Sequence, residues 1–414
     1  MSRVVAPPVA APPAALANGP VQVSVATGAA GLLAVGALWL AARYGPRQGA
    51  LLLLVGAALG LTLHHAVFGF TAAYRALVTV GDGRGVRAQL LMLAVATVLF
   101  APVLAAGEIF GASVAGAVAP AGVSVLVGAF VFGVGMQIAG GCGSGMLYHL
   151  GAGVTPMLAT LVGFVAGAVL ATFHMPFWWA TPSLGDVSLA ESLGWTGAVV
   201  LQLAACALLA LVSWTVERRR VDARSSLPVP VTGWRRVAQG PWPLGVGAVL
   251  LALLNLVTLV VAGTPWSITW AFALWGAKAL VAMGYDLSGV AFWSGEFQRT
   301  ALAAPILADV TSVMDLGLVL GALLGAGLAG RFAPRRRVPA RRVAAAVLGG
   351  LLLGYGSRIA YGCNIGALFG GIASTSLHGW LWAGAALAGT PLGVRLRGLF
   401  WAERAAPAGV NAVP

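Results

Sequence analysis

Apolar segments long enough to cross a bilayer recur along almost the whole chain of 414 residues. A helix needs about 20 mostly apolar residues to cross the hydrocarbon core, where it satisfies its own backbone hydrogen bonds. Nine segments have this length and pattern: 24–42, 88–106, 121–141, 155–173, 195–216, 244–262, 306–330, 343–361 and 377–394. The pattern predicts an all-α polytopic membrane protein with about nine transmembrane helices.

Two further apolar stretches, 48–74 and 266–298, are interrupted by Gly, His, Ser and charged residues. Membrane proteins tolerate such interruptions where the chain lines a cavity or is buried in protein. We therefore expect broken or re-entrant helix pairs in both stretches. Residues 1–20 are rich in Pro and small residues, and residues 405–414 follow the last arginine. We expect a disordered leader and a disordered tail there.

The composition excludes a soluble globular domain. Hydrophobic residues make up 59% of the chain and charged residues only 8%, whereas soluble proteins carry about 25% charged residues. The net charge of +13 would suit a nucleic-acid partner, but the arginines form short clusters between apolar segments instead of one basic face. We expect membrane lipid and no nucleic acid as partners. Three cysteines are too few for a disulfide framework or a zinc site, and we predict no metal and no cofactor.

The arginine clusters predict which loops face the cytoplasm, because cytoplasmic loops carry an excess of Lys and Arg. The clusters are Arg43 and Arg47; Arg75, Arg84 and Arg87; Arg218 to Arg220 with Arg224, Arg235 and Arg236; Arg331 through Arg342; and Arg395, Arg397 and Arg404. Segments 107–120 and 174–194 contain no Lys or Arg and are expected outside. With nine spans, the amino terminus then lies outside and the carboxyl terminus in the cytoplasm.

The chain contains an internal repeat. The segment GVGMQIAGGCGSGML at 133–147 matches GYGSRIAYGCNIGAL at 354–368 at a constant offset of 221, with eight identical positions out of fifteen. A weaker match pairs FGFTAAYR at 68–75 with FWSGEFQR at 292–299. The repeat predicts two halves of related structure.

The loops that precede the two repeated motifs differ in charge. Segment 107–120 contains no Lys or Arg, whereas segment 331–342 holds six arginines. Equivalent loops on opposite sides of the membrane indicate inverted-topology repeats, whose substrate site commonly lies on broken helices at the repeat interface. We expect a first membrane repeat over 21–194, a connecting span and cytoplasmic loop over 195–242, and a second repeat over 243–404.

Cys142 and Cys363 are the candidate functional residues of the repeat, each in a Gly-Cys-x-x-Gly motif. The flanking glycines can release the helix and leave a thiol and backbone N–H groups facing a cavity; they are Gly141, Gly145, Gly362 and Gly366. A small buried cysteine can also be inert packing, but the duplication favours a function. Thiols are soft ligands, so the pair suits a soft sulfur-bearing ion better than a hard oxyanion or a sugar. Cys206 has no repeat mate, and we expect it to be core.

Four further polar residues are candidates for a substrate path. Ser144 and Asn364 follow the cysteines closely and can hydrogen-bond ligand oxygens or satisfy a helix end. Lys278, the only lysine, lies in an apolar stretch and would either hold an anion or extend to the membrane interface. Arg358 precedes Cys363 by five residues and would either assist it or anchor the span at the cytoplasmic face.

At these motifs the chain resembles the YeeE/YedE sulphur-transport family of bacterial inner-membrane proteins. The most specific segments are GGCGSG at 140–145, AKALVAMGYDLSG at 277–289 and SRIAYGCNIGALFGGIASTSLHGWLW at 357–382. The resemblance implies a location in the bacterial inner membrane and uptake of thiosulfate or a similar sulfur-containing ion. It also implies that Cys142 and Cys363 correspond to pore cysteines that relay the ion's terminal sulfur through thiol–sulfur hydrogen bonds.

The resemblance carries two further implications. A third relay cysteine, present in some family members, has no equivalent here, because Cys206 lies in a different segment. A small cytoplasmic sulfurtransferase commonly receives the sulfur and is the expected protein partner.

The predicted function is therefore a permease, and we expect no enzyme activity. The chain contains no Walker loop, catalytic triad pattern or Rossmann fingerprint, so transport is not driven by ATP hydrolysis in this chain. A membrane sulfurtransferase that forms a cysteine persulfide is one alternative. A transporter of a selenium-containing or other sulfur ion is a second, and a membrane scaffold or accessory subunit is a third.

Overall fold

The computed structural model describes residues 18–220, 233–334 and 337–401. Within these residues, nine helical segments are long and apolar enough to cross a membrane: Val23–Tyr44, Pro46–Val80, Arg84–Ala106, Val123–Gly151, Pro156–Trp179, Leu189–Arg219, Leu244–Ala262, Val310–Leu328 and Ala340–Ala373. The prediction of an all-α polytopic membrane protein is confirmed. The predicted leader lies almost entirely outside the described residues, and the predicted tail lies entirely outside them.

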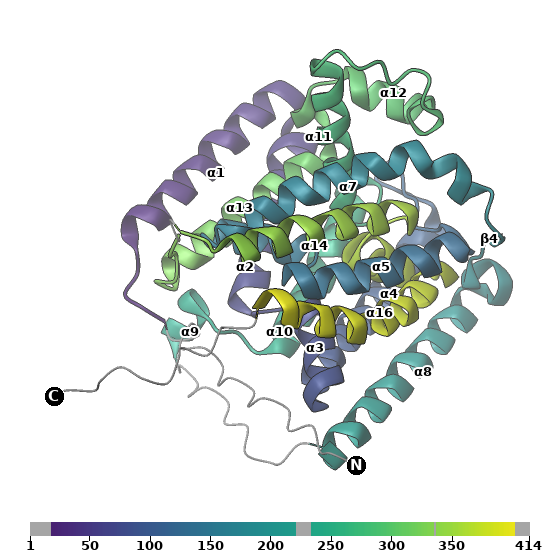
Figure 1. Cartoon of the computed structure of the whole chain (residues 1–414), viewed down its shortest axis with the longest axis horizontal. Coiled ribbons are helices and arrows are strands. Elements are labelled where there is room, and N and C mark those ends of the chain that lie inside the picture. Colours follow the sequence, from purple (N-terminus) through teal and green to yellow (C-terminus); the bar gives the residue numbers. More distant parts are fainter. Residues whose placement is uncertain (1–17, 221–232, 335–336, 402–414) are drawn as a thin grey trace.

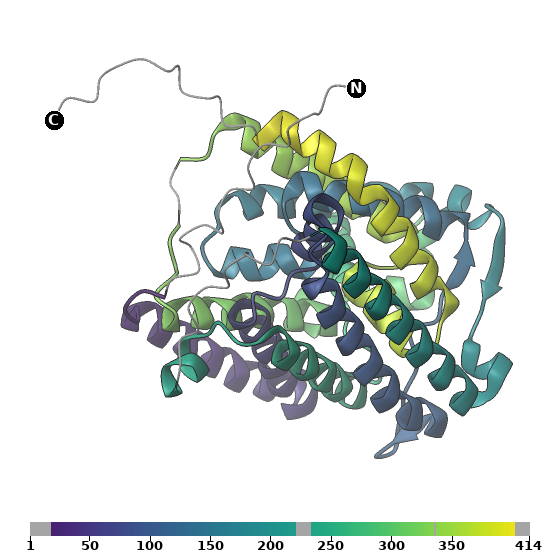
Figure 2. The ribbon, with the colours of Figure 1, turned by 90° about the horizontal axis from the view of Figure 1, so that it is seen from below.

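The long helices lie side by side, with short helices and strands at their ends (Figures 1 and 2). The helices up to the middle of the chain are α1 (Val23–Tyr44), η2 (Pro46–Leu51), α2 (Leu52–His65), α3 (Phe70–Val80), α4 (Arg84–Ala106), α5 (Val123–Ala139), α6 (Gly143–Gly151), α7 (Pro156–Trp179) and α8 (Leu189–Arg220). The later helices are α9 (Trp234–Gln239), α10 (Leu244–Ala262), α11 (Thr269–Ala282), η3 (Ala291–Trp293), α12 (Glu296–Ala303), η4 (Ile306–Ala308), α13 (Val310–Leu328), α14 (Ala340–Ile359), η5 (Asn364–Gly370), α15 (Gly371–Ala373) and α16 (Leu377–Trp401).

Four short strands form two antiparallel pairs. The first pair joins β1 (Glu108–Ile109) to β2 (Ala112–Ser113). The second pair joins β3 (Pro120–Gly122), just before α5, to β4 (Ser183–Asp186), after α7. We call the end of the bundle that carries these strands the strand end.

The expected break within 48–74 lies only at its carboxyl-terminal side. η2 and α2 form one continuous helical run from Pro46 to His65, and the chain then breaks before α3. Glycine does not interrupt α2, because its glycines are close-packing positions: a Cβ on Gly56 or Gly60 would collide with backbone oxygens of α13. The second expected break is confirmed, since α11, η3 and α12 divide the stretch 266–298.

α5 and α14 lie side by side at the centre of the molecule (Figure 1), and each is flanked by a helix of the other half. α7 packs along α14, and α16 packs along α5. The close approach of α7 to α14 depends on glycine. A Cβ on Gly167 would collide with the backbone oxygen of Leu351, and a Cβ on Gly354 would collide with the backbone oxygen of Phe164. α7 begins at Pro156 and α16 at Leu377, which is the same offset of 221 that relates the two motifs.

Both described ends of the chain lie at one end of the bundle. The Gln22 side chain donates to the carbonyl oxygen of Phe332 at 2.9 Å and accepts from its N–H at 3.0 Å. Arg341 donates to the carbonyl oxygen of Leu399, and Trp401 lies nearby on α16. We call this the arginine end, because it holds segment 331–342; it lies at the left in Figure 1, opposite β4.

The sequence analysis expected the two ends of the chain on opposite faces of the membrane, whereas both described ends lie at the same end of the helix bundle. The sequence-based count left out the crossing made by η2 and α2, because glycines were taken as helix breaks. The nine expected spans already include α16, so adding this helical run gives ten long helical segments within the described residues, an even number.

Candidate functional site

Both cysteine motifs lie where a long helix ends and a short helix begins. Cys142 follows α5 and is the N-cap residue of α6, with extended backbone angles of φ −93° and ψ −167°. Cys363 follows α14 and is the N-cap residue of η5, with φ −104° and ψ −164°. The turns before them use positive φ angles at Gly140 (+86°) and Gly362 (+152°), which glycine adopts at least cost. The expected helix interruption is present in both motifs.

The two motifs meet in the core although they are 221 residues apart in sequence. A Cβ placed on Gly143 would lie 3.4 Å from the Sγ atom of Cys363, so the backbone beside Cys142 contacts the second thiol. α6 and η5 also pack against each other. Both thiols are buried, with Cys142 1% and Cys363 0% exposed. The structure thus places the two cysteines of the repeat in one buried cluster.

Polar groups surround the thiols. The Oγ of Ser144 lies 3.6 Å from the Sγ of Cys142, and the N–H of Ile365 donates to the Sγ of Cys363 at 3.4 Å. Asn364 is fully buried, and its side-chain oxygen and nitrogen have no hydrogen-bond partner among the described residues. Buried amide groups without partners are costly, so this position suits a polar ligand.

The motif glycines allow close approach of backbone and thiol. A Cβ on Gly145 would lie 3.4 Å from the thiol of its own motif, and one on Gly366 would lie 3.6 Å from the hydroxyl of Ser267. Gly141 and Gly362 form the turns, where a Cβ would come within 3.3 Å and 2.6 Å of a backbone nitrogen in the following helix. Larger residues at these positions would fill the space around the thiols.

Lys278 and Arg358 are not part of the cysteine cluster. The Nζ of Lys278 donates to the carbonyl oxygens of Leu302 at 2.6 Å and Ala304 at 2.5 Å, so it satisfies the carboxyl-terminal end of α12. Arg358 lies 5.1 Å from the ring centroid of Phe292, at the end of α14 far from the arginine end. Arg358 therefore lies apart from the arginines of segment 331–342.

A cavity of about 390 Å³ lies on the strand-end side of the cysteines, and we call it the strand-end chamber. Its lining includes Ser267, Asp309, Thr311 and Met314, from the segment before α11 and from the start of α13. Ser267 is the residue that contacts the backbone at Gly366. The chamber therefore reaches the short helix that follows Cys363.

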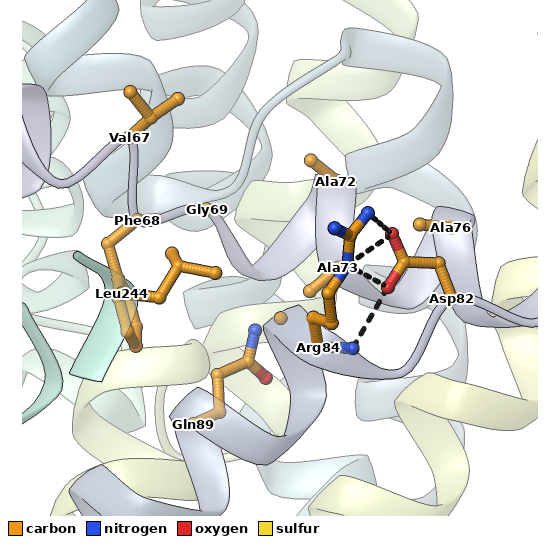
Figure 3. Close-up of a pocket in the computed structure, with 11 residues that line it drawn as sticks. Val67, Phe68, Gly69, Ala72, Ala73, Ala76, Asp82, Arg84, Gln89 and Leu244 are labelled. Carbon is orange, nitrogen blue, oxygen red and sulfur yellow. Dashed lines mark hydrogen bonds and ion pairs between the residues drawn. The ribbon is translucent and has the colours of Figure 1, made fainter. Parts of the chain in front are cut away.

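A second cavity, of about 280 Å³, lies between α3, α4 and α10 at the arginine end (Figure 3). We call it the arginine-end chamber. Gly69 and Ala72 line it, and the side chain of Thr71, between them, lies beside the Cys142 thiol. Hydrogen bonds from Arg84 hold the pKa of Asp82 below its usual range at the rim of this chamber. The two chambers thus approach the cysteine cluster from opposite ends.

A third cavity, of about 490 Å³, also lies at the arginine end, and we call it the basic chamber. α6 runs from Cys142 to this cavity. The basic side chains that line it are His64, His149, Arg331, Arg337 and Arg342, and no acidic side chain is among its described lining residues. Such a cavity attracts anions.

Several residues of these chambers were not predicted from the sequence. Thr71 falls within the weak repeat match at 68–75, which was the available signal. Gln89 and Ser267 gave none, because their positions depend on how α4 and the segment before α11 pack around the motifs.

Comparison with known proteins agrees with this architecture. The family model for sulphur transport matches residues 65–392, which is most of the chain. The chain belongs to this family. The resemblance noted from the cysteine motifs is confirmed, and with the nine apolar helices it identifies a multi-pass membrane protein.

Members of the sulphur transport family with curated names include two thiosulfate transporters. TsuA of Spirochaeta thermophila is 26% identical over 80% of this chain and 93% of its own length. TsuA of Escherichia coli K12 is 27% identical over 79% of this chain and 88% of its own length. The probable transporter YedE of Escherichia coli K12 is 34% identical, and YedE of Salmonella typhimurium is 31% identical. The chain spans only about a third of the length of these YedE relatives, at 33% and 37%.

Proposed function

We propose that this protein is a permease that carries thiosulfate or a similar sulfur-containing anion across a bacterial inner membrane, past Cys142 and Cys363. The observation that carries the proposal is the meeting of the two repeated cysteine motifs, at buried helix breaks, between the strand-end chamber and the arginine-end chamber. The family and the names of the two TsuA relatives support the class of substrate.

The chemistry of the cluster matches such an ion. Thiosulfate is a dianion with one soft sulfur and three oxygens, and a neutral thiol can donate a hydrogen bond to that sulfur. The unpartnered amide of Asn364, the hydroxyl of Ser144 and the N–H groups at the start of α6 can bind the oxygens. Several weak contacts along a path allow an ion to leave as readily as it enters.

We also propose the orientation and the symmetry of the halves. The arginine end faces the cytoplasm, because segment 331–342 holds six arginines, so both described ends of the chain are cytoplasmic. α5 of the first half packs on α16 of the second half, and α14 of the second half packs on α7 of the first half. This exchange of helices between the halves supports two inverted repeats. α1 packs on α13 of the second half, and α8 packs on α4 of the first half. α8 thus holds the place relative to the first half that α1 holds relative to the second. This supports including α8 in the second repeat rather than in a separate connection over 195–242.

Uptake of sulfur-labelled thiosulfate into proteoliposomes tests the proposal. We expect Cys142→Ala, Cys363→Ala and the double variant each to lose most of the uptake, because each removes a thiol from the cluster that both chambers approach. Cys206→Ala is the matched control: Cys206 is also buried, but it lies on α8 outside the motifs. Sulfate, which lacks the soft sulfur, should compete weakly.

The outcomes separate this function from its alternatives. Normal uptake by both folded cysteine variants, or no uptake by the wild type, would refute the proposed path. Gain of one sulfur atom on a cysteine, without accumulation inside the vesicle, would favour the membrane sulfurtransferase. If a selenium analogue competes more strongly than unlabelled thiosulfate, the assigned substrate would be a selenium-containing ion. The resemblance supports a small cytoplasmic sulfurtransferase as acceptor of the sulfur, bound at the arginine end. Co-purification of such a protein with this chain would test it.

A further inference from the structure

α13 carries a carboxyl group for which the described structure provides no partner. Asp315 is 0% exposed, and neither of its side-chain oxygens has a hydrogen-bond partner among the described residues. Asp309 on the same helix shows the contrast, since it accepts from the N–H and hydroxyl of Ser312 and from Trp270. Asp315 is therefore not part of a structural hydrogen-bond network.

Asp315 lies at the boundary between the strand-end chamber and the cysteine cluster. Thr311 and Met314 line the chamber, and Asp315 is the next residue along α13. It is within electrostatic range of the Cys363 thiol. Its place is fixed by close packing, since Cβ atoms on Gly317 and Gly321 would collide with the backbone of α2. An anion passing from the chamber to Cys363 must approach this carboxyl.

Counted from the helix start, the place of Asp315 is taken by a neutral side chain in α4. Asp315 is the sixth residue of α13, and Gln89 is the sixth residue of α4. Gln89 lines the arginine-end chamber (Figure 3), whereas Asp315 directly follows Met314, which lines the strand-end chamber. An amide has nearly the shape of a protonated carboxyl and carries no charge. A neutral polar side chain is therefore accommodated at this place in α4.

We propose that Asp315 is a proton-binding site, and that it must be protonated for the anion to occupy the path beside Cys363. This inference rests on the proposed function, in which the anion passes Cys363. An ionised carboxylate here would be buried without a partner and would repel a dianion, whereas the neutral acid can donate its proton in a hydrogen bond to the anion. The proton comes from water, and the carboxylate becomes a carboxylic acid. Proton binding and anion binding then promote each other to the same extent.

Other titratable groups near α13 do not account for this site. The elements packed against α13 carry Arg43, Tyr44, Arg47, His64, His65, Tyr148, His149, Arg235, Arg236 and Lys278, together with Cys142 and Cys363 at the starts of the two short helices. His64 and His65 lie beside Gly325, ten residues farther along α13, or about 15 Å. Lys278 is bound to the carbonyls at the end of α12. Asp309 is the charged group that acts electrostatically on Asp315, and Asp315 in turn acts on the Cys363 thiol.

The test compares Asp315→Asn with wild type in proteoliposomes that have equal pH inside and outside, from roughly pH 6 to pH 8. We expect wild-type thiosulfate uptake to fall with rising pH, by up to about tenfold per unit above its midpoint. Asp315→Asn should stay active and vary less than about twofold over the range. Asp286→Asn, the matched control, changes an exposed acid in the turn after α11 and should keep the wild-type slope.

Each outcome decides the inference. A wild-type slope in Asp315→Asn would assign the pH dependence to another group, such as the histidines of the basic chamber. Loss of uptake in a folded Asp315→Asn, or failure of this variant to fold, would show that the ionised form is needed. Either result overturns the proposal, which predicts that the neutral isostere is tolerated.

A second measurement separates this inference from the proposed function. At a pH above the midpoint of the uptake profile, thiosulfate added to weakly buffered wild-type protein in detergent should raise the pH of the solution as Asp315 binds a proton, and Asp315→Asn should give no such change. If the wild type takes up no thiosulfate, the infrared carbonyl band of a protonated carboxyl, which appears as the pH is lowered, still reports the proton site. Absence of a band that Asp315→Asn removes would refute the site independently of the substrate.

Discussion

Replacement of Gly354 by Ala tests whether the close packing of α14 on α7 holds the cysteine cluster together. A Cβ at this position would lie 2.5 Å from the backbone nitrogen of Ala168 and 2.9 Å from the carbonyl carbon of Gly167, and it would collide with the oxygen of Phe164. These are backbone atoms of a long helix, so they cannot move aside as a flexible side chain would. One helix must shift by roughly 1 Å to restore ordinary contact distances, and such overpacking costs about 1–3 kcal/mol.

Gly384→Ala on α16 is the matched control. A Cβ there would meet nothing within 4 Å. Both substitutions gain the same helix propensity, about 1 kcal/mol. The difference in the free energy of unfolding between the two variants is therefore the cost of the collision, with Gly354→Ala less stable by about 1–3 kcal/mol.

Thermal unfolding of the two variants in the same detergent measures this difference, and thiosulfate uptake measures its effect on the site. We expect Gly354→Ala to melt several degrees below Gly384→Ala and to transport more slowly, because α14 leads directly into Cys363. Equal melting temperatures for the two variants would show that α7 and α14 separate at no cost. That result would refute the packing argument.

Two further predictions concern charged residues. Lys278→Met should remove the two hydrogen bonds to Leu302 and Ala304 and lower the free energy of unfolding by roughly 1 kcal/mol. Thiosulfate uptake should stay within about threefold of wild type. Abolished uptake by the folded variant would place Lys278 in the path. The pKa of Asp82 is held low by Arg84, so this pair stabilises the protein above the unfolded pKa of about 3.9 and the stabilisation is lost as pH falls through the folded pKa. Because both side chains are partly exposed, Asp82→Asn should cost less than about 1 kcal/mol at pH 7. This cost should become smaller as pH falls below about 3.9. A cost in melting experiments that does not change with pH would contradict this assignment.

The sequence was a good guide to the membrane class and to the cysteine motifs, and a poor guide to the crossing number. Glycines at 56 and 60 were taken as breaks, but in the structure they are contact points of α2 with α13. A glycine has the same local signature in both roles. Only the presence of a neighbouring backbone distinguishes them.

The candidate functional residues divide in the same way. Cys142 and Cys363 were identified because duplication is visible in the sequence, and the structure brings them together. Lys278 was a candidate as the only lysine, yet it satisfies a helix end, whereas Asp315 was not a candidate and is a buried carboxyl without a hydrogen-bond partner among the described residues. The surroundings of a single charge depend on helices distant in sequence.

The sequence by itself determined that the protein is helical and lies in a membrane, and that two glycine–cysteine motifs repeat along it. These properties follow from hydrophobicity, spacing and identity, which are local. The tertiary structure decided which glycines are breaks, that both described ends lie at one end of the helix bundle, and which polar side chains lie close to the cysteine cluster. Packing between distant helices sets these features, because the cost of a buried charge or a close backbone contact exists only once the partners have come together.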